Sequence, residues 1–333
     1  MESRLAAAAE RTTAVIVHYG PWATTRRTLE SLRRHAPGIE VRIVDNGGES
    51  VPREVARGVD VRLLSAGRNL GYGAACNLGA QGSEREWLLF LNNDVEIGAG
   101  TLDAMAAVLA RERDVAAVGP RLWNAEGKPT RSIGRAPSPR RVLFENLFLP
   151  RLLPGIPFFH GHHTVLLSHR RARDIETMLG AIVLVRRADF AKIEGFSEDF
   201  FFYAEESDLF ERLRRAGRKV RFEPAARAVH YGGVASQTLD QGERDRRLHE
   251  GLRLYARRFH GASGERRTAR ALRWGATLRW LLSFVEFGPR RQARRRRYAD
   301  IRAMYRRERE SSTASSRAGN EDEWRRGPDS NRR

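Results

Sequence analysis

The chain is poor in cysteine and has no long apolar run. Both absences limit the classes of protein to which it can belong. A single cysteine, Cys76, occurs in 333 residues, so no disulfide can form within the chain. This fits a reducing compartment. The first residues lack the long apolar region of a secretory signal, so we expect a cytoplasmic protein. A hydrophobic content of 41% is enough for a sizeable core.

Acidic residues are also scarce relative to basic ones. The chain has 60 Lys and Arg residues against 41 Asp and Glu, a net charge of +19. Residues 251–310 hold 18 arginines and 5 acids, which accounts for +13 of that excess. Such a segment is often a solvated surface, and the functional alternatives are an anionic membrane surface or nucleic acid. Nucleic acid would explain the arginines but not the ordered acidic motifs described below, so we expect no specific nucleic-acid partner.

The most apolar part of the basic segment is residues 274–287. This stretch is too short to span a bilayer, and it contains Arg279 and Glu286. An apolar, aromatic stretch beside a basic cluster suits a helix that lies on a membrane surface. Its apolar residues are not confined to one helical face, however. Burial against the main domain is therefore an equal alternative.

Strand and helix patterns alternate along the first 120 residues. The expected elements are strands at 13–18, 41–44, 59–64, 87–91 and 115–118, and helices at 22–35, 73–82 and 101–113. This alternation predicts an α/β domain, with a mostly parallel sheet covered by helices on both faces. In such sheets, ligands bind beyond the carboxyl ends of the strands.

The alternation of strand and helix patterns is lost from residue 128 to about 177. A long irregular segment in a compact domain is usually functional or mobile. The pattern then resumes. It predicts strands at 178–185, 220–222 and 226–230, and helices at 188–193 and 205–216. We expect four parts: a flexible N-terminus over 1–11, a globular domain over 12–240, a basic helical extension over 241–310, and a disordered tail over 311–333.

Polar residues stand directly after three of the predicted strands: Asp45, Asn69 and Asp94. Asp45 precedes Asn-Gly-Gly and could simply form a turn, as could the Asn-Asn-Asp sequence that ends at Asp94. A divalent cation such as Mg²⁺ takes oxygen ligands, often from one or two carboxylates together with substrate phosphates. Asp94 is suited to that role as well.

A glycine-rich approach to a helix runs from Arg68 to Asn77, with an arginine suited to phosphate. Gly71 and Gly73, with Asp94 about twenty residues later, imitate a dinucleotide-binding motif. The motif fails in detail. Its third glycine is replaced by Cys76, and the segment follows the third predicted strand instead of the first.

Acidic residues gather where an aromatic run, residues 200–203, enters a predicted helix. Glu205, Glu206 and Asp208 stand there, and His230 follows one strand later. A carboxylate beside an apolar wall suits a general base, because the wall can hold its pKa near the working pH. The alternative is electrostatic, since acids at a helix N-terminus stabilise it by about 0.3–1 kcal/mol.

Five such motifs, in this order, resemble the inverting glycosyltransferases of family 2, in the branch that includes bacterial rhamnosyltransferases. The resemblance covers about residues 13–235. The glycine-rich part matches the family at Asn69, Gly71, Tyr72, Gly73 and Asn77. It implies a nucleotide-diphospho-sugar transferase fold of the GT-A type over residues 12–240, with the basic helical extension appended.

The resemblance also implies roles for individual residues. It assigns nucleotide-sugar binding to Tyr19, Asp45, Arg68, Asn69, Gly71, Asn92 and Asn93. It assigns the acceptor side to Gly180, Phe196 and Tyr203, and a site for Mg²⁺ or Mn²⁺ to Asp94, Asn92 and His230. Asn92 replaces the first aspartate of the family's metal motif, so metal affinity should be weaker than with two carboxylates.

For catalysis the resemblance implies that the second acid of the Glu205-Glu206 pair is the base. Glu206 stands where the family usually has aspartate, which moves the carboxylate by roughly 1 Å. Asp208 is the alternative base, and it shares a helical face with Glu205.

The activity implied is transfer, with inversion, of a sugar from a nucleotide diphosphate donor to a hydroxyl of a saccharide or lipid-linked saccharide in cell-surface polysaccharide synthesis. The branch suggests dTDP-rhamnose, with UDP-sugars as the close alternative. A non-catalytic nucleotide-sugar-binding protein is the rival, because Asn92 and Glu206 depart from the family. With such an acceptor, residues 142–159 and the basic segment would form a surface that places the protein at the inner face of the cell membrane, as a peripheral protein.

Overall fold

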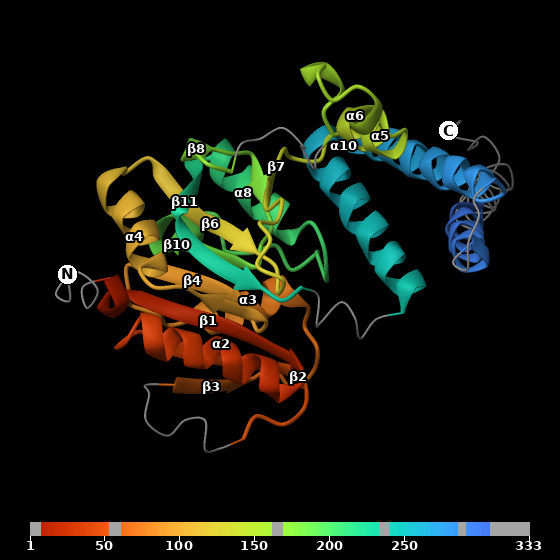
Figure 1. Cartoon of the computed structure of the whole chain (residues 1–333). Coiled ribbons are helices and arrows are strands. Elements are labelled where there is room, and N and C mark those ends of the chain that lie inside the picture. The colour runs from red at the N-terminus through yellow and green to blue at the C-terminus, as the bar shows by residue number, and fades with distance from the viewer. Residues whose placement is uncertain (1–7, 53–60, 162–168, 233–239, 286–290, 307–333) are drawn as a thin grey trace, which may run out of the picture.

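A nine-stranded sheet forms the centre of the molecule (Figure 1), in a computed structural model that describes residues 8–52, 61–161, 169–232, 240–285 and 291–306. The strand order is β3-β2-β1-β4-β10-β6-β11-β5, and β8 pairs with β11. The strands of this sheet are β1 (Thr12–Gly20), β2 (Glu40–Gly48), β3 (Val61–Ser65), β4 (Trp87–Asn92), β5 (Val95–Ile97), β6 (Val115–Trp123), β8 (Arg173–Asp174), β10 (Ile182–Arg186) and β11 (Lys219–His230). Strands β7 (Ile133–Gly134) and β9 (Thr177–Met178) form a separate pair.

Strand direction explains where a ligand site can form. Strand β1 runs parallel to β2 and β4, and β6 runs parallel to β11. Strand β10 lies antiparallel between β4 and β6. The beginning of β10 therefore lies at the same sheet edge as the ends of β1, β4 and β11. The predicted mostly parallel sheet is confirmed, with β10, β5 and β8 as the reversed strands in the described part of the chain.

Helices cover both faces of the sheet, as predicted. On one face lie α2 (Trp22–His35) and α4 (Thr101–Arg111), whose leucines, including Leu29 and Leu109, are buried against the sheet. On the other face lie α3 (Tyr72–Ala80), α7 (Arg187–Lys192) and α8 (Glu205–Arg215). Each helix buries one apolar stripe, because residues three or four apart share a helical face.

The segment predicted to be irregular contains two short helices and a 3-10 turn: α5 (Pro139–Asn146), α6 (Leu149–Leu152) and η2 (Pro157–Phe159). Helix α5 begins after Ser138, whose hydroxyl accepts a hydrogen bond from the Arg141 backbone N–H, and Pro139 suits the first helical position. The two strands predicted at 220–222 and 226–230 are one strand, β11, with a register shift between Glu223 and Arg227.

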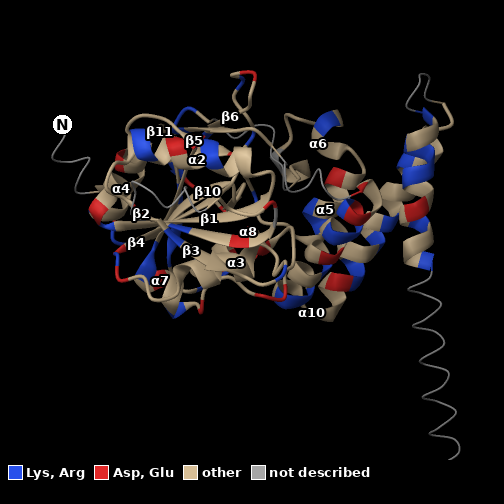
Figure 2. Cartoon of the chain, turned by 90° about the horizontal axis from the view of Figure 1, so that it is seen from below, with Lys and Arg blue, Asp and Glu red and all other residues tan. Residues whose placement is uncertain are grey.

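The C-terminal extension is helical, as predicted. Helix α10 (Gln241–Leu282) has a kink at Gly261, where φ is 68°. It packs with α5 and with the helix at 291–306 around a small core of its own, formed by Val142, Leu252, Ala271, Leu272, Ala276, Ile301 and Tyr305. Figure 2, in which Lys and Arg are blue, shows many basic residues along this helical part.

Of the two alternatives for residues 274–287, burial is met in part, in the small core around α10, and membrane contact stays a prediction. Residues 286 and 287 lie outside the described residues. Ala276 is buried in the extension's core, whereas Leu281 and Val285 are exposed. No helix in the described ranges is long and apolar enough to cross a membrane.

The flexible N-terminus predicted for residues 1–11 is wrong from residue 8 onward. Ala8 and Ala9 lie in a helical turn and are buried, because their small side chains fit against the core. Residues 1–7 and the predicted tail over 311–333 lie outside the described residues.

Candidate functional site

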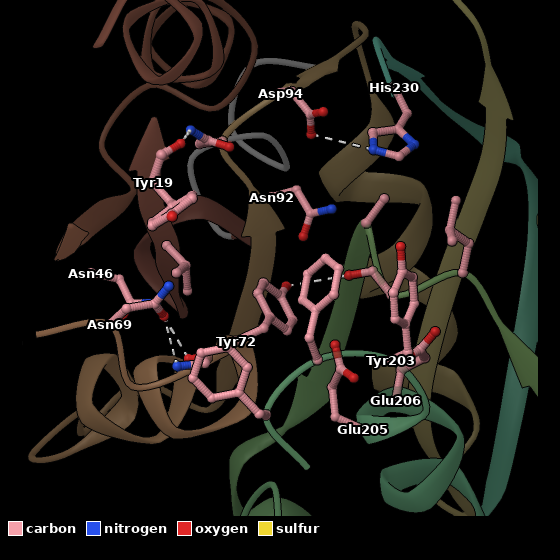
Figure 3. Close-up of a pocket in the computed structure, with 18 residues that line it drawn as sticks. Tyr19, Asn46, Asn69, Tyr72, Asn92, Asp94, Tyr203, Glu205, Glu206 and His230 are labelled. Carbon is pink, nitrogen blue, oxygen red and sulfur yellow. Dashed lines mark hydrogen bonds and ion pairs between the residues drawn. The ribbon is translucent and has the colours of Figure 1, made fainter. Parts of the chain in front are cut away.

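A pocket of about 230 Å³ opens at the sheet edge where β1, β4 and β11 end and β10 begins (Figure 3). Most of the predicted site residues line it. These are Tyr19, Asn69, Gly71, Asn92, Asn93, Asp94, Gly180, Tyr203, Glu205, Glu206 and His230. Residues separated by more than 200 positions thus meet at one place, as the strand directions require.

Four predicted site residues do not line this pocket: Asp45, Arg68, Phe196 and Asp208. The Asp45 carboxylate accepts a hydrogen bond from the Gly47 backbone N–H at 3.2 Å, which is a turn-forming contact. Arg68 is exposed. The Phe196 ring is buried against Phe90, with ring centroids 5.3 Å apart. It forms part of the core beneath the pocket.

Glu205 and Glu206 enter the pocket from the first turn of α8. The two preceding residues, Tyr203 and Ala204, have φ values of 71° and 70°, which non-glycine residues rarely adopt. Gly180 packs directly against Glu206. A Cβ at Gly180 would lie 3.0 Å from the Glu206 Cβ, so the glycine leaves room for the glutamate side chain.

The two carboxyl groups have different protonation behaviour. Burial raises the pKa of Glu206 to about 7. Burial, followed by repulsion from Glu206, raises the pKa of Glu205 well above its usual range. The Glu205 Oε2 atom also has no hydrogen-bond partner among the described residues. Two adjacent carboxyl groups in a desolvated site do not both ionise at low cost, and Glu206 can exchange a proton near neutral pH.

Asp208 has a different environment from both glutamates. Its side chain is fully buried, and its two oxygens accept hydrogen bonds from Arg212 Nε and Arg258 Nη1, each at 2.7 Å. Both of its oxygens are thus occupied by guanidinium groups, and the side chain does not line the pocket. Of the two bases that the sequence left open, the geometry favours Glu206.

Asp94 and His230 form a pair at the opposite wall. Asp94 Oδ1 lies 3.3 Å from His230 Nε2, and Figure 3 shows Asn92 beside them. His230 Nε2 has no hydrogen-bond partner among the described residues. A group of three or more His, Cys, Asp or Glu side chains able to hold a metal is absent from the described ranges. One carboxylate, one imidazole and one amide oxygen fit a divalent cation that takes its remaining ligands from a diphosphate and water.

Several residues that the sequence did not assign to the site hold its walls in place. Asn46 Nδ2 donates to Asn69 Oδ1 at 3.1 Å, and Asn46 Oδ1 accepts from the Leu70 backbone N–H at 2.8 Å. The Tyr72 hydroxyl donates to the Gly180 carbonyl at 3.2 Å, which joins α3 to the start of β10. The sequence offered one signal for Asn46, its position at the end of a predicted strand, where ligand sites form in such sheets.

Asn93 and Gly71 line the pocket but also have structural contacts. Asn93 Nδ2 donates to the Tyr19 carbonyl at 2.9 Å and so fixes the end of β1. A Cβ at Gly71 would lie 2.4 Å from the Phe201 carbonyl oxygen, and its φ is +83°. Only glycine permits this conformation and this approach without strain.

Comparison with known proteins agrees with this geometry. The family model described as glycosyl transferase family 2 matches residues 13–170, and the model described as the N-terminal domain of galactosyltransferase matches residues 161–232. The N-acetylglucosaminyl-diphospho-decaprenol L-rhamnosyltransferase of Mycobacterium tuberculosis is 31% identical over 231 residues, which cover 65% of this chain and 75% of that protein. The low-salt glycan biosynthesis hexosyltransferase Agl10 of Haloferax volcanii is 25% identical over 232 residues, with 68% and 67% covered.

Solved structures show the same fold. The mannosyltransferase PcManGT from Pyrobaculum calidifontis, in complex with GDP-Man and Mn²⁺, superposes with a TM-score of 0.54 at 15% identity and covers 89% of this chain and 82% of that one. GalNAc-T7 with UDP, GalNAc and Mn²⁺ gives 0.50 at 16% identity, with 66% and 42% covered. The predicted GT-A type fold is confirmed. By its family model, its relatives and its fold, this chain belongs to glycosyl transferase family 2.

Proposed function

We propose that the protein transfers a sugar, in this pocket, from a nucleotide diphosphate donor to an acceptor hydroxyl. The transfer is a single displacement that inverts the configuration of the anomeric carbon. The observation that carries this proposal is Glu206, a pocket carboxylate whose pKa is raised to about 7. Glu206 takes the proton of the acceptor hydroxyl while that oxygen bonds to the anomeric carbon. The bond from the anomeric carbon to the diphosphate oxygen breaks at the same time, and its electron pair leaves with the nucleotide. No covalent enzyme intermediate forms.

The donor would lie between the aromatic wall at Tyr19 and the pair formed by Asp94 and His230. Asp94, His230 and the Asn92 amide would hold Mg²⁺ or Mn²⁺, which would offset the charge of the departing diphosphate. Glu205, in its protonated form, can donate a hydrogen bond to a sugar or acceptor hydroxyl. We assign no donor contact to Asp45 or Arg68, because neither lines the pocket.

The best-supported donor is dTDP-rhamnose, with UDP-sugars as the alternative, since several relatives are named rhamnosyltransferases. The acceptor proposed is a saccharide or lipid-linked saccharide. A non-catalytic nucleotide-sugar-binding protein is not favoured, because binding alone needs no carboxylate whose pKa is raised to about 7.

We further propose that the loop of residues 149–159, the α6 loop, lies on an anionic membrane surface, which would make the protein peripheral at the inner face of the cell membrane. Leu152 is 69% exposed and Phe158 is 55% exposed, and Leu153 and Ile156 are exposed as well. The guanidinium of Arg140 lies 4.8 Å from the centroid of the Phe158 ring. Exposed apolar side chains next to arginines are the combination that binds an interface with negative lipids.

Replacing the proposed base tests the mechanism. We expect Glu206→Gln to lower kcat by about 10²- to 10⁴-fold, the usual contribution of a positioned base. Binding of the donor nucleotide should be retained, because the amide has the same shape. The readout is nucleotide release with a saccharide acceptor, and Glu84→Gln, at an exposed glutamate, is the matched control.

The pH profile of the wild-type enzyme belongs to the same test. Glu206 must be deprotonated to accept a proton, so kcat/KM should rise as pH increases through about 7. Undiminished turnover in Glu206→Gln, or a rate independent of pH in this range, would show that another group is the base.

Donor class and metal dependence can be read from thermal stability. We expect dTDP or UDP with Mn²⁺ to stabilise the protein, since a ligand at 100 times its dissociation constant adds about 2.7 kcal/mol. Chelation of the metal, or Asp94→Asn, should remove most of this gain. Stabilisation by NAD alone, or by none of these nucleotides, would contradict the proposal.

Vesicle binding tests the α6 loop. A Leu152→Ser, Phe158→Ser double variant should lose most of its co-sedimentation with vesicles that contain anionic phospholipid. Leu63→Ser is the matched control, because Leu63 is 45% exposed on strand β3 at the far edge of the sheet. Equal binding by both variants would rule the loop out. Membrane binding could also be tested by deleting residues 266–310 of the basic segment. We prefer point substitutions, because that deletion would remove Ala271 and Ile301 from the extension's core.

A further inference from the structure

The turn that carries the two pocket glutamates is backed by α10. Tyr203 and Ala204, which precede Glu205, both have left-handed backbone conformations. Such conformations are strained at non-glycine residues and persist only where the surroundings fix them. The surroundings of this turn therefore decide where the glutamates point.

Helix α10 lies directly against the turn at Gly251. A Cβ at Gly251 would stand 2.5 Å from the Tyr203 carbonyl oxygen and 3.4 Å from the Ala204 Cβ. Glycine inside a helix is less favourable than alanine. Here it allows a contact between helix and turn that a larger residue would prevent.

Arg258, two turns further along α10, connects both ends of the segment at 199–208. Its Nη1 donates to Asp208 Oδ1 at 2.7 Å, and its Nη2 donates to Asp199 Oδ2. Asp208 is fully buried two residues after Glu206, whereas Asp199 precedes the aromatic run. A guanidinium bound to two carboxylates restricts both of them, and the buried one cannot exchange its partner for water.

Aromatic contacts extend the same support to the pocket wall. Phe200 is buried in a small cluster with Tyr255 of α10. The Arg247 guanidinium, also on α10, lies 4.2 Å from the centroid of the Phe201 ring, and Phe201 lines the pocket. Residues 199–208 are thus held at several points by one helix of the extension.

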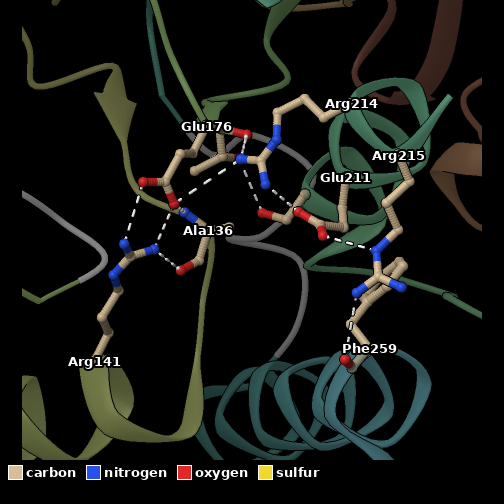
Figure 4. Close-up of polar contacts among 9 residues, drawn as sticks. Ala136, Arg141, Glu176, Glu211, Arg214, Arg215 and Phe259 are labelled. Atoms are coloured by element: carbon tan, nitrogen blue, oxygen red, sulfur yellow. Dashed lines mark hydrogen bonds and ion pairs between the residues drawn. The ribbon is translucent and has the colours of Figure 1, made fainter. Parts of the chain in front are cut away.

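Further polar contacts fasten the rest of α8 to the same helical part (Figure 4). Glu211 pairs with Arg214 and Arg215, and Arg215 Nη2 donates to the Phe259 carbonyl of α10 at 3.4 Å. Arg141 of α5 pairs with Glu176, whose carbonyl accepts from Arg214 Nη1 at 3.4 Å. Helix α8 therefore contacts α10 at two places, Asp208 near its start and Arg215 at its end.

We propose that Arg258 is a positioning residue for transfer: by joining Asp208 and Asp199 to α10, it holds the turn so that Glu206 faces the reacting centre. This inference rests on the proposed function for the role of Glu206. It gives the extension a part in catalysis that is separate from any membrane contact.

The test uses Arg258→Gln in the full-length chain, with Arg257→Gln as the matched control. Arg257 is the preceding residue, its side chain is 71% exposed, and its replacement changes the charge equally. We expect Arg258→Gln to lower kcat by about 10- to 100-fold, since a displacement of about 1 Å can have that effect. The KM for the donor and the stabilisation by nucleotide with Mn²⁺ should stay within about twofold. Arg258→Lys, which retains a cation for one carboxylate, should restore part of kcat.

Two measurements keep the inference falsifiable if Arg258→Gln folds poorly or wild-type transfer is not detected. Asp199→Asn removes half of the bridge at a side chain that is 63% exposed, and it should give an intermediate loss of kcat. Hydrogen exchange of residues 199–208 should be faster in Arg258→Gln and in Asp199→Asn than in Arg257→Gln. Equal exchange and equal kcat in all three variants would overturn the inference. The wild type could show no transfer while its residues 199–208 still exchange more slowly than those of Arg258→Gln. That result would count against the proposed function and not against this inference.

Discussion

The site depends on the placement of two adjacent carboxyl groups where water has little access. Glu205 and Glu206 begin α8 against a wall of aromatic side chains, and their desolvation raises both pKa values. Two neighbouring carboxylates in such a place cannot both be charged at low cost, and Glu206 can exchange its proton near neutral pH. The strained turn before them, the glycine packed against Glu206 and the helix behind them all serve to keep this pair in place.

The sheet supplies the opposite half of the site. Because β10 runs against its neighbours, Gly180 at its start meets Asn92 at the end of β4, and His230 arrives from the end of β11. Donor and acceptor chemistry can thus share one pocket, with the Asp94–His230 pair at one wall and the glutamates at the other. The helical extension fixes the glutamate side of that pocket from behind.

Much of this could be predicted from the sequence, because buried strands and glycine-rich turns leave local signals. The strand ends at Asn92 and Asp94 and the acids at the start of α8 were predicted from such signals. Long-range packing was not predictable. Phe196 is a core residue and Asp208 is held by two arginines, one of which is fifty residues away. Spacing along the chain carries no information about that arginine. Helix α5 was missed for a related reason, because its buried residue Val142 packs in the core around α10.

The central proposal is that the acceptor oxygen displaces the nucleotide directly, with Glu206 as its base. The configuration of the anomeric carbon in the product, measured by NMR against that of the donor, tests this claim most directly. A single displacement predicts the opposite configuration in product and donor. Retention of configuration would contradict the account, because it requires a second displacement or a different mechanism that a lone base in this pocket does not provide.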